Sequence, residues 1–290
     1  MPSGMGKLTK LQKLTDFFLG KQSGSSINEL GKLQYLQESI CIWNLQNVVN
    51  PQDAAEADLK VKKQLEGLQL RWDGDTDESQ LERNVLEKLE PHANLKSLEI
   101  YGYGGTRFPE WMGVMNAGRS TSLEEIDVPS LEYLSLADLP EVESFPESGL
   151  PAKLQSLSIW SCNKLIAGRM QWNLHSHPSL SRLEISMNEG VESFPEDNML
   201  PSTLTYLEIS HFKNLKALND GIQQLTSLTD FRIFDCPELQ FLPQKGLPSS
   251  LSSLEIRRCP LLGFTSLVED WHKISHISDI RINGHHIRLH

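Results

Sequence analysis

The amino-acid sequence predicts an α/β repeat protein, in which one short strand from each repeat joins a parallel sheet. Three observations support this prediction. The apolar pattern L-x-x-L-x-[L/I] recurs along the 290 residues, and its clearest copies are 23 to 26 residues apart. A further position, eight residues after the first leucine, is usually apolar or cysteine, and Phe-Pro or Leu-Pro pairs stand between the copies. A fixed period of this kind indicates a solenoid, because each repeat packs only on its neighbours.

The pattern also places the strands. Within one copy, Leu157 and Ile159 alternate with Ser158 and Trp160, as in a strand with one buried face. The clearest copies begin at Leu131, Leu154, Leu180, Leu204, Leu228 and Leu251, and further copies begin at Leu65, Leu95 and Ile277. A period of about 20–29 residues is that of leucine-rich repeats. We therefore expect a leucine-rich-repeat solenoid over residues 1–290 as a single domain, with a concave parallel β-sheet and an irregular, loop-rich convex side.

The position eight residues after the first leucine predicts an inward-facing ladder. It is occupied by Tyr103, Leu139, Cys162, Asn188, Phe212, Cys236 and Cys259. The cysteines could be read as a metal or redox site, but one thiol in a repeat cannot supply the closely spaced pairs that zinc prefers. Buried ladder cysteines are the better interpretation.

The proline motifs predict what lies between strands. Phe-Pro or Leu-Pro follows the strands at Phe108, Phe145, Phe194 and Leu242, and Leu-Pro-x-x-Leu precedes them at Leu150, Leu200 and Leu247. Proline removes a backbone donor and blocks a long helix, so loops and short turns are expected on the convex side.

Residues 51–91 interrupt the pattern and predict a helix-containing, elaborated repeat. The segment Asp53–Glu56 resembles a capping box that opens a helix through Lys63. A second helical spacing runs from Asp77 to Leu89. The two helices flank a strand at 65–70, and we expect them to pack on the edge of the solenoid.

Composition limits the classes of function. The formal charge of -11 disfavours nucleic acid, which needs a clustered basic surface. No apolar run approaches the roughly 20 residues of a membrane span. Neither a secretory signal nor an N-x-Ser/Thr acceptor is found, and the four cysteines are widely spread. A cytoplasmic or nucleo-cytoplasmic protein is therefore expected.

Three segments imitate catalytic or metal-binding motifs without completing them. The segment 4–7 resembles a phosphate loop, but Leu8 stands where Ser or Thr should hold magnesium. The acidic run 73–77 resembles a calcium loop, but Glu78 replaces its glycine. The pair His272 and His276 lacks the adjacent Glu of a metalloprotease. We expect no enzyme activity, no cofactor and no metal site.

Longer segments resemble a known family. They are Gly6–Gly20, Tyr101–Trp111, and Cys259–Leu262 followed by Glu269–Ile277. Together they resemble the repeat domain of plant coiled-coil, nucleotide-binding, leucine-rich-repeat disease-resistance proteins. The segments that this family places before its repeats, including the nucleotide-binding region, are not found here. The resemblance therefore implies only the sensing and restraining module, which recognises a pathogen effector or a guarded host protein and holds a switch domain off.

The concave face is the expected binding surface, because its outward side chains are fixed by strands but fill no core. The outward positions hold Glu99, Ser135, Ser158, Glu184, Glu208, Arg232, Glu255 and Arg281 in one row, and Tyr101, Ala137, Trp160, Ser186, Ser210, Phe234, Arg257 and Asn283 in the next. The candidate partner-binding residues are Tyr101, Trp160, Glu184, Glu208, His211, Arg232, Phe234, Glu255 and Arg257.

Aromatic and arginine residues are typical anchors of protein interfaces, and the glutamates would favour a basic partner surface. The alternative is that the aromatic rings only shield neighbouring repeats. A second possible function is that of an adaptor or inhibitor that holds a client protein on the same face, as ligase substrate receptors do. No F-box-like segment is recognised before the first repeat.

Overall fold

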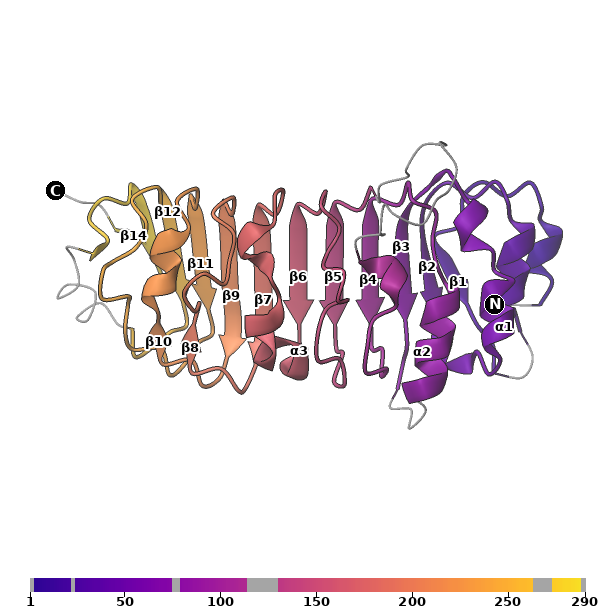
Figure 1. Cartoon of the computed structure of the whole chain (residues 1–290), viewed down its shortest axis with the longest axis horizontal. Coiled ribbons are helices and arrows are strands. Elements are labelled where there is room, and N and C mark those ends of the chain that lie inside the picture. Colours follow the sequence, from indigo (N-terminus) through magenta and orange to yellow (C-terminus); the bar gives the residue numbers. More distant parts are fainter. Residues whose placement is uncertain (1–2, 22–23, 75–78, 114–129, 263–272, 288–290) are drawn as a thin grey trace. The chain divides into compact units, whose positions relative to one another are not determined.

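The computed structural model describes residues 3–21, 24–74, 79–113, 130–262 and 273–287. The chain divides into two compact units, 1–154 and 155–290. Each unit contains its own run of parallel strands (Figure 1). The predicted fold class, a leucine-rich-repeat array, is therefore confirmed, whereas its continuity as one domain over 1–290 stays a prediction.

The first unit holds five parallel strands in chain order. They are β1 (Asp16–Phe18), β2 (Glu38–Trp43), β3 (Leu65–Arg71), β4 (Ser97–Tyr101) and β5 (Tyr133–Ala137). The register is that of the sequence pattern, with Leu98 opposite Leu134 and Ile100 opposite Leu136. All four of these side chains are buried, so they form the core side of the sheet.

The second unit repeats this arrangement with one strand in each turn of the solenoid. Its main sheet contains β6 (Ser156–Trp160), β7 (Arg182–Asn188), β9 (Tyr206–Phe212), β11 (Asp230–Phe234), β12 (Ser253–Arg257) and β13 (Asp279–Ile282), all parallel, and the antiparallel β14 (His285–Ile287). A separate parallel pair, β8 (Ser193–Phe194) and β10 (Ala217–Leu218), lies away from this sheet.

The convex side is irregular, as the proline motifs predict. Short turns close at the Leu-Pro motifs, where the Leu154 amide donates to the Pro151 carbonyl at 2.9 Å and Leu251 to Pro248 at 3.0 Å. The helix α3 (Asn163–Ala167) is short, and 3-10 turns stand in several of the connections. These turns are Met5–Lys7, Ile27–Lys32, Leu45–Asn47, Leu59–Val61, Glu110–Met112, Arg169–Gln171, Leu174–Ser176 and Asp220–Gln224.

The two predicted helices exist, but the first begins and ends elsewhere. Helix α1 (Pro51–Ala55) is capped by Asn50, whose side chain accepts from the Gln52 amide at 3.1 Å. The predicted capping box at Asp53 and the helix through Lys63 are wrong, because Asp58 takes a left-handed conformation with φ of 49°. An asparagine before a proline at the first helical position is the stronger start signal.

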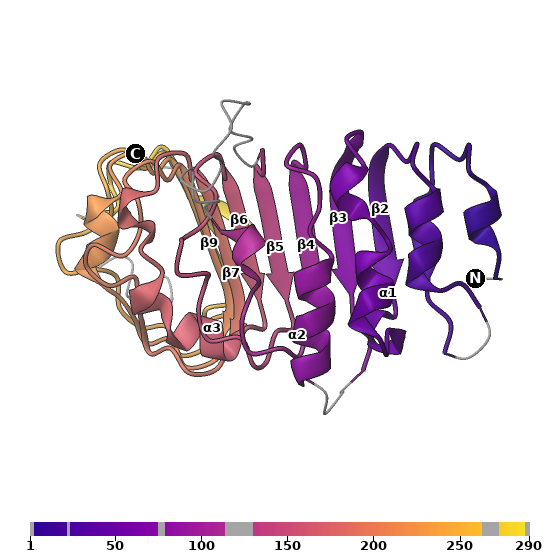
Figure 2. The ribbon, with the colours of Figure 1, turned by 45° about the vertical axis from the view of Figure 1, so that its right-hand side comes forward.

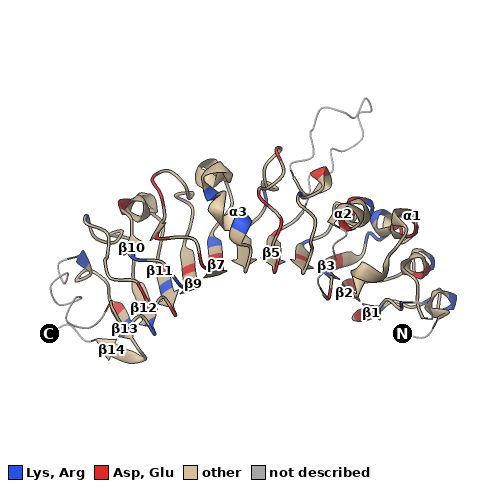
Figure 3. Ribbon diagram, turned by 90° about the horizontal axis from the view of Figure 1, so that it is seen from below, with Lys and Arg blue, Asp and Glu red and all other residues tan. Residues whose placement is uncertain are grey.

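Helix α2 (Ser79–Lys88) lies within the predicted segment, of which 77–78 fall outside the described residues. It buries Val85 and Leu86 and packs against α1. Both helices lie behind the strands of the first unit, on the side where the connecting loops run (Figures 2 and 3). They therefore cover the convex side, and the predicted position at the edge of the solenoid is wrong.

A left-handed residue recurs at the end of the strand in seven repeats, which the sequence pattern did not predict. It is the seventh residue after the first leucine of a copy, and it has positive φ at Gly102, Asp138, Ser161, Met187, His211, Asp235 and Arg258. This conformation turns the chain from the sheet toward the core, so that the next residue enters the ladder. The ladder is confirmed, because all seven of its predicted members are buried.

The ladder cysteines should resist a thiol reagent in the native protein. Cys162, Cys236 and Cys259 are buried, and none forms a disulfide. Each thiol donates to the carbonyl two residues before it. We expect labelling to require unfolding, whereas a cysteine placed at the exposed Ser202 should react at once. Rapid native labelling of any ladder cysteine would contradict the buried assignment.

Candidate functional site

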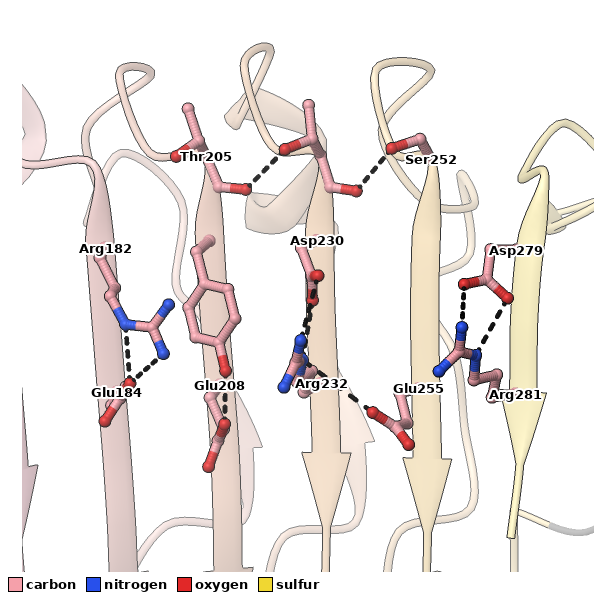
Figure 4. Close-up of polar contacts among 12 residues, drawn as sticks. Arg182, Glu184, Thr205, Glu208, Asp230, Arg232, Ser252, Glu255, Asp279 and Arg281 are labelled. Atoms are coloured by element: carbon pink, nitrogen blue, oxygen red, sulfur yellow. Dashed lines mark hydrogen bonds and ion pairs between the residues drawn. The ribbon is translucent and has the colours of Figure 1, made fainter. Parts of the chain in front are cut away.

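The outward-pointing side chains of each sheet form what we call its open face. In the second unit, one row runs Ser158, Glu184, Glu208, Arg232, Glu255 and Arg281 from strand to strand, and the next runs Trp160, Ser186, Ser210, Phe234 and Arg257. Both rows were predicted from the repeat register. The strands thus bring the candidate residues of both rows onto one surface, and Figure 4 shows Glu184, Glu208, Arg232 and Glu255 on neighbouring strands.

These residues differ in how far they reach solvent. Trp160 is 40 % exposed, and Tyr101 on the first unit is 37 % exposed. His211 and Arg257 are exposed, while Phe234 and the charged Glu184, Glu208 and Arg232 are half-buried. Glu255 is only 7 % exposed, and its role as a partner contact stays a prediction.

Most charges of this face are already paired within it. Arg182 Nε donates to Glu184 at 2.8 Å, and Arg232 Nε donates to Asp230 at 3.0 Å. Arg257 pairs with Glu255, and Arg281 with Asp279. Figure 3 shows acidic and basic residues mixed along these strands. The surface is therefore not a uniformly acidic one, and its attraction for a basic partner must come from particular carboxylates.

Tyr206 lies at the centre of this charged network. The guanidinium of Arg182 lies 3.5 Å from the centre of its ring, and that of Arg232 lies 5.2 Å from it. Its hydroxyl donates to Glu208 at 2.6 Å. Burial, together with the neighbouring Glu208 carboxylate, raises the pKa of Tyr206 above its usual range. The phenol therefore stays neutral and acts as a hydrogen-bond donor, which fixes the Glu208 side chain.

His211 takes the left-handed conformation near the end of β9. Its ring lies 3.4 Å from Ser186 Oγ through Nδ1 and 3.4 Å from Asp235 Oδ2 through Nε2. Ser210 Oγ in turn donates to Ser186 Oγ at 2.9 Å, and Arg258 Nε lies 2.9 Å from Asp235. These contacts hold the loop ends of three neighbouring repeats in one polar chain. These contacts fix the His211 ring on the open face, and its role in partner binding stays a prediction.

The first unit carries an aromatic row of which the sequence pattern selected only Tyr101. Phe18, Trp43, Arg71 and Tyr101 stand side by side on neighbouring strands. The rings of Phe18 and Trp43 stack with centres 5.4 Å apart. The Arg71 guanidinium lies 4.7 Å from the Trp43 ring and 5.1 Å from the Tyr101 ring. The row is preorganised, because stacking fixes each side chain before any partner arrives.

The polar groups of this row differ in whether they have a partner. Trp43 Nε1 donates to Asp16 at 2.8 Å, and this hydrogen bond lowers the pKa of Asp16. Arg71 forms no ion pair with any described residue, and its Nε is buried without a hydrogen-bond partner there. Burial raises the pKa of the neighbouring Cys41 to about 11, so that thiol does not neutralise Arg71.

No metal-binding cluster is found in the described part of the chain. Among those residues, no group of three or more His, Cys, Asp or Glu side chains could hold a metal ion. The two segments that imitate metal sites are only partly described, since 75–78 and His272 lie outside the described residues. No helix within the described ranges is long and apolar enough to cross a bilayer.

Comparison with known proteins agrees with the repeat geometry. A family model described as R13L1/DRL21 leucine-rich repeats matches residues 27–162. The array of strands, ladder and open face thus defines a leucine-rich-repeat protein of this type.

The relatives identify the family further. The chain is 34 % identical over 260 residues to the disease resistance protein RGA2 and 31 % identical over 275 residues to the putative disease resistance protein RGA1, both of Solanum bulbocastanum. These matches cover 73 % and 75 % of this chain but 27 % and 28 % of the relatives. A putative RPP13-like disease resistance protein of Arabidopsis thaliana is 32 % identical over 260 residues. The chain belongs to the leucine-rich-repeat region of plant disease resistance proteins.

Proposed function

We propose that the chain is the protein-recognition module of a plant intracellular immune receptor. The observation that carries this proposal is the set of exposed aromatic and arginine side chains on the open face of each unit. Tyr101 and Trp160 are exposed side chains of strands β4 and β6, and Tyr101 is also held by the Arg71 guanidinium over its ring. Rigid aromatic anchors beside arginines are the residues that contribute most to protein–protein affinity.

The module would act by binding alone. Its partner would be a pathogen effector, a guarded host protein, or the nucleotide-binding switch domain that the resemblance implies. The proposed location is the cytoplasm or the cytoplasm and nucleus, and the proposed mechanism needs no cofactor, metal or chemical step. Binding the switch domain would restrain it, and a competing effector on the same face would release it, because one surface cannot hold both.

The alternative is a repeat adaptor or inhibitor that holds a client protein. The same open face would serve it, so surface geometry does not separate the two. Binding to the nucleotide-binding segment of RGA2 does, because only the receptor module should recognise it.

Removing two aromatic anchors should abolish binding without unfolding the protein. We expect Trp160→Ala combined with Phe234→Ala to lose about 1,000-fold in affinity for the RGA2 nucleotide-binding segment, since such anchors each contribute about 2 kcal/mol and about 1.4 kcal/mol corresponds to a factor of ten. The melting temperature should change little. Affinity is measured by biolayer interferometry and stability by circular dichroism.

Phe241→Ala is the matched control, because Phe241 is an aromatic residue that is 60 % exposed but lies outside the open face. This variant should bind as the unmodified chain does. Normal binding by the double variant, or loss caused by unfolding, would refute the assignment of the open face. Absence of binding by the unmodified chain would favour the adaptor function.

A further inference from the structure

The open face of the second unit holds arginines in a recurring arrangement with a ring and a glutamate. Arg257 pairs with Glu255, which lies two residues before it on β12. Directly opposite Arg257 on β11 is Phe234, and the guanidinium lies 5.7 Å from the centre of that ring. The cation thus has a carboxylate on its own strand and an aromatic face on the neighbouring strand.

Arg182 repeats this arrangement on β7. Its carboxylate partner Glu184 is again two residues away on the same strand, and Tyr206 stands directly opposite on β9. The guanidinium lies 3.5 Å from the centre of the Tyr206 ring. Two examples on one face show that this surface binds arginine side chains by stacking and charge pairing together.

A third such position exists without an arginine. On the other side of β11, the residue directly opposite Phe234 is Ser210, and Glu208 lies two residues before it on β9. Ser210 therefore occupies on β9 the position relative to Phe234 that Arg257 occupies on β12, and Glu208 corresponds to Glu255. Ser210 is short, only 4 % exposed, and hydrogen-bonded to Ser186, so it does not fill the place that an arginine takes elsewhere.

Glu208 is the carboxylate that lacks a cation. It accepts a hydrogen bond from Tyr206, but no lysine, arginine or histidine in the described ranges forms an ion pair with it. The other carboxylates of this face do have such partners, namely Glu184, Asp230, Asp235, Glu255 and Asp279. Arg232, on the neighbouring strand, is directed to Asp230 and lies 4.0 Å from Glu255 (Figure 4).

We propose that the place above Ser210 is a binding site for one arginine side chain of a protein partner, held by the Glu208 carboxylate and the Phe234 ring. This inference rests on the proposed function and names the chemistry that the open face recognises. Arginine suits the site better than lysine, because a planar guanidinium can stack on the ring and donate to the carboxylate at the same time. Tyr206 holds Glu208 in place, so the site is formed before the partner binds.

A random 12-residue peptide library displayed on phage tests the proposal. We expect peptides selected on the unmodified chain to share one required arginine, whose replacement by lysine weakens binding. Glu208→Gln should lower their affinity by about 10-fold or more, the range expected for a charge-assisted hydrogen bond. Glu192→Gln is the matched control, because Glu192 is an exposed glutamate away from the open face that pairs with Lys216.

A second pair of variants tests the position itself. Ser210→Arg should supply the missing arginine from within the chain and block the peptides, whereas Ser210→Ala should leave them bound. If Ser210→Arg does not fold, the Glu208→Gln result decides. Peptides that need no arginine, or that bind Glu208→Gln normally, overturn this inference. Peptides that overturn the arginine site are then measured against Trp160→Ala. If Trp160→Ala weakens their binding, the proposed function of the open face stands. If Trp160→Ala binds them normally, the proposed function fails together with the arginine site.

Discussion

Gly102→Ala is expected to lower the free energy of unfolding by about 4 kcal/mol or more, the loss typical of a severe steric conflict in a core. Gly102 occupies the left-handed position after β4 with φ of 70°, and its amide donates to the Ala137 carbonyl at 2.9 Å. A Cβ atom there would lie far inside van der Waals contact with the backbone carbonyl oxygen of Trp72. The Trp72 side chain is buried against Tyr103, so this backbone cannot move away.

Gly149→Ala separates the steric conflict from backbone strain. Gly149 also has positive φ, at 82°, but a Cβ atom there meets nothing within 4 Å. Its substitution should cost only the strain of the left-handed conformation, about 1–2 kcal/mol. Both losses are measured by urea unfolding followed by tryptophan fluorescence. Equal losses for the two variants would show that the contact with Trp72 is not what requires glycine at position 102.

The strand register of the later repeats could be predicted from sequence because one residue type dominates each buried position. A leucine at the start of a copy fixes which residues face outward, so Trp160, Glu208 and Phe234 were placed correctly. The left-handed residue was missed because it has no common side chain. It is Met187, His211 or Arg258 in different repeats, and the conformation is imposed by the turn toward the core.

Phe18, Trp43 and Arg71 of the aromatic row were missed for different reasons. In β2, Ile40 and Ile42 pair with Leu68 and Leu70, so Gln37 stands where other copies begin with leucine and the pattern does not lead to Trp43. In β1, Phe18 follows a copy whose first leucines are replaced by polar residues. Arg71 could have been predicted from sequence, because the regular copy at Leu65 places it in the same outward row as Tyr101. The ion pair between Glu255 and Arg257 could be recognised only from the three-dimensional structure.

Lys62→Ala is expected to cost about 4 kcal/mol, although a lysine is usually a surface residue. Lys62 is 1 % exposed, and its Nζ donates to the carbonyls of Leu30 at 2.8 Å and Leu33 at 3.1 Å. These carbonyls belong to the end of a 3-10 turn, so the ammonium caps them from the next repeat. Alanine would leave a cavity and two carbonyls without this donor.

Two further variants divide this loss. Lys62→Met keeps most of the side-chain volume and should cost about 2 kcal/mol, the penalty for carbonyls that lose their donor. Lys60→Ala is the control, because Lys60 forms only an exposed pair with Glu90, and it should cost less than about 1 kcal/mol. A loss for Lys62→Met no larger than that of Lys60→Ala would mean that the two hydrogen bonds do not stabilise the fold.

The stabilisation by Lys62 should also depend on pH, in a direction set by burial. Burial lowers the pKa of the Lys62 ammonium from its ordinary 10.5, and Asp58 opposes this shift. Between the lowered value and about 10.4, the unfolded chain binds more protons than the folded chain, so the free energy of unfolding rises with pH. Urea unfolding at a series of pH values from about 7 to about 10.5 should therefore show the unmodified chain gaining stability relative to Lys62→Met as pH rises. The tyrosines titrate in both proteins and cancel in this difference. A difference that shrinks with rising pH would mean that the folded state binds the proton more tightly, and that the two carbonyls outweigh the loss of solvent around the ammonium.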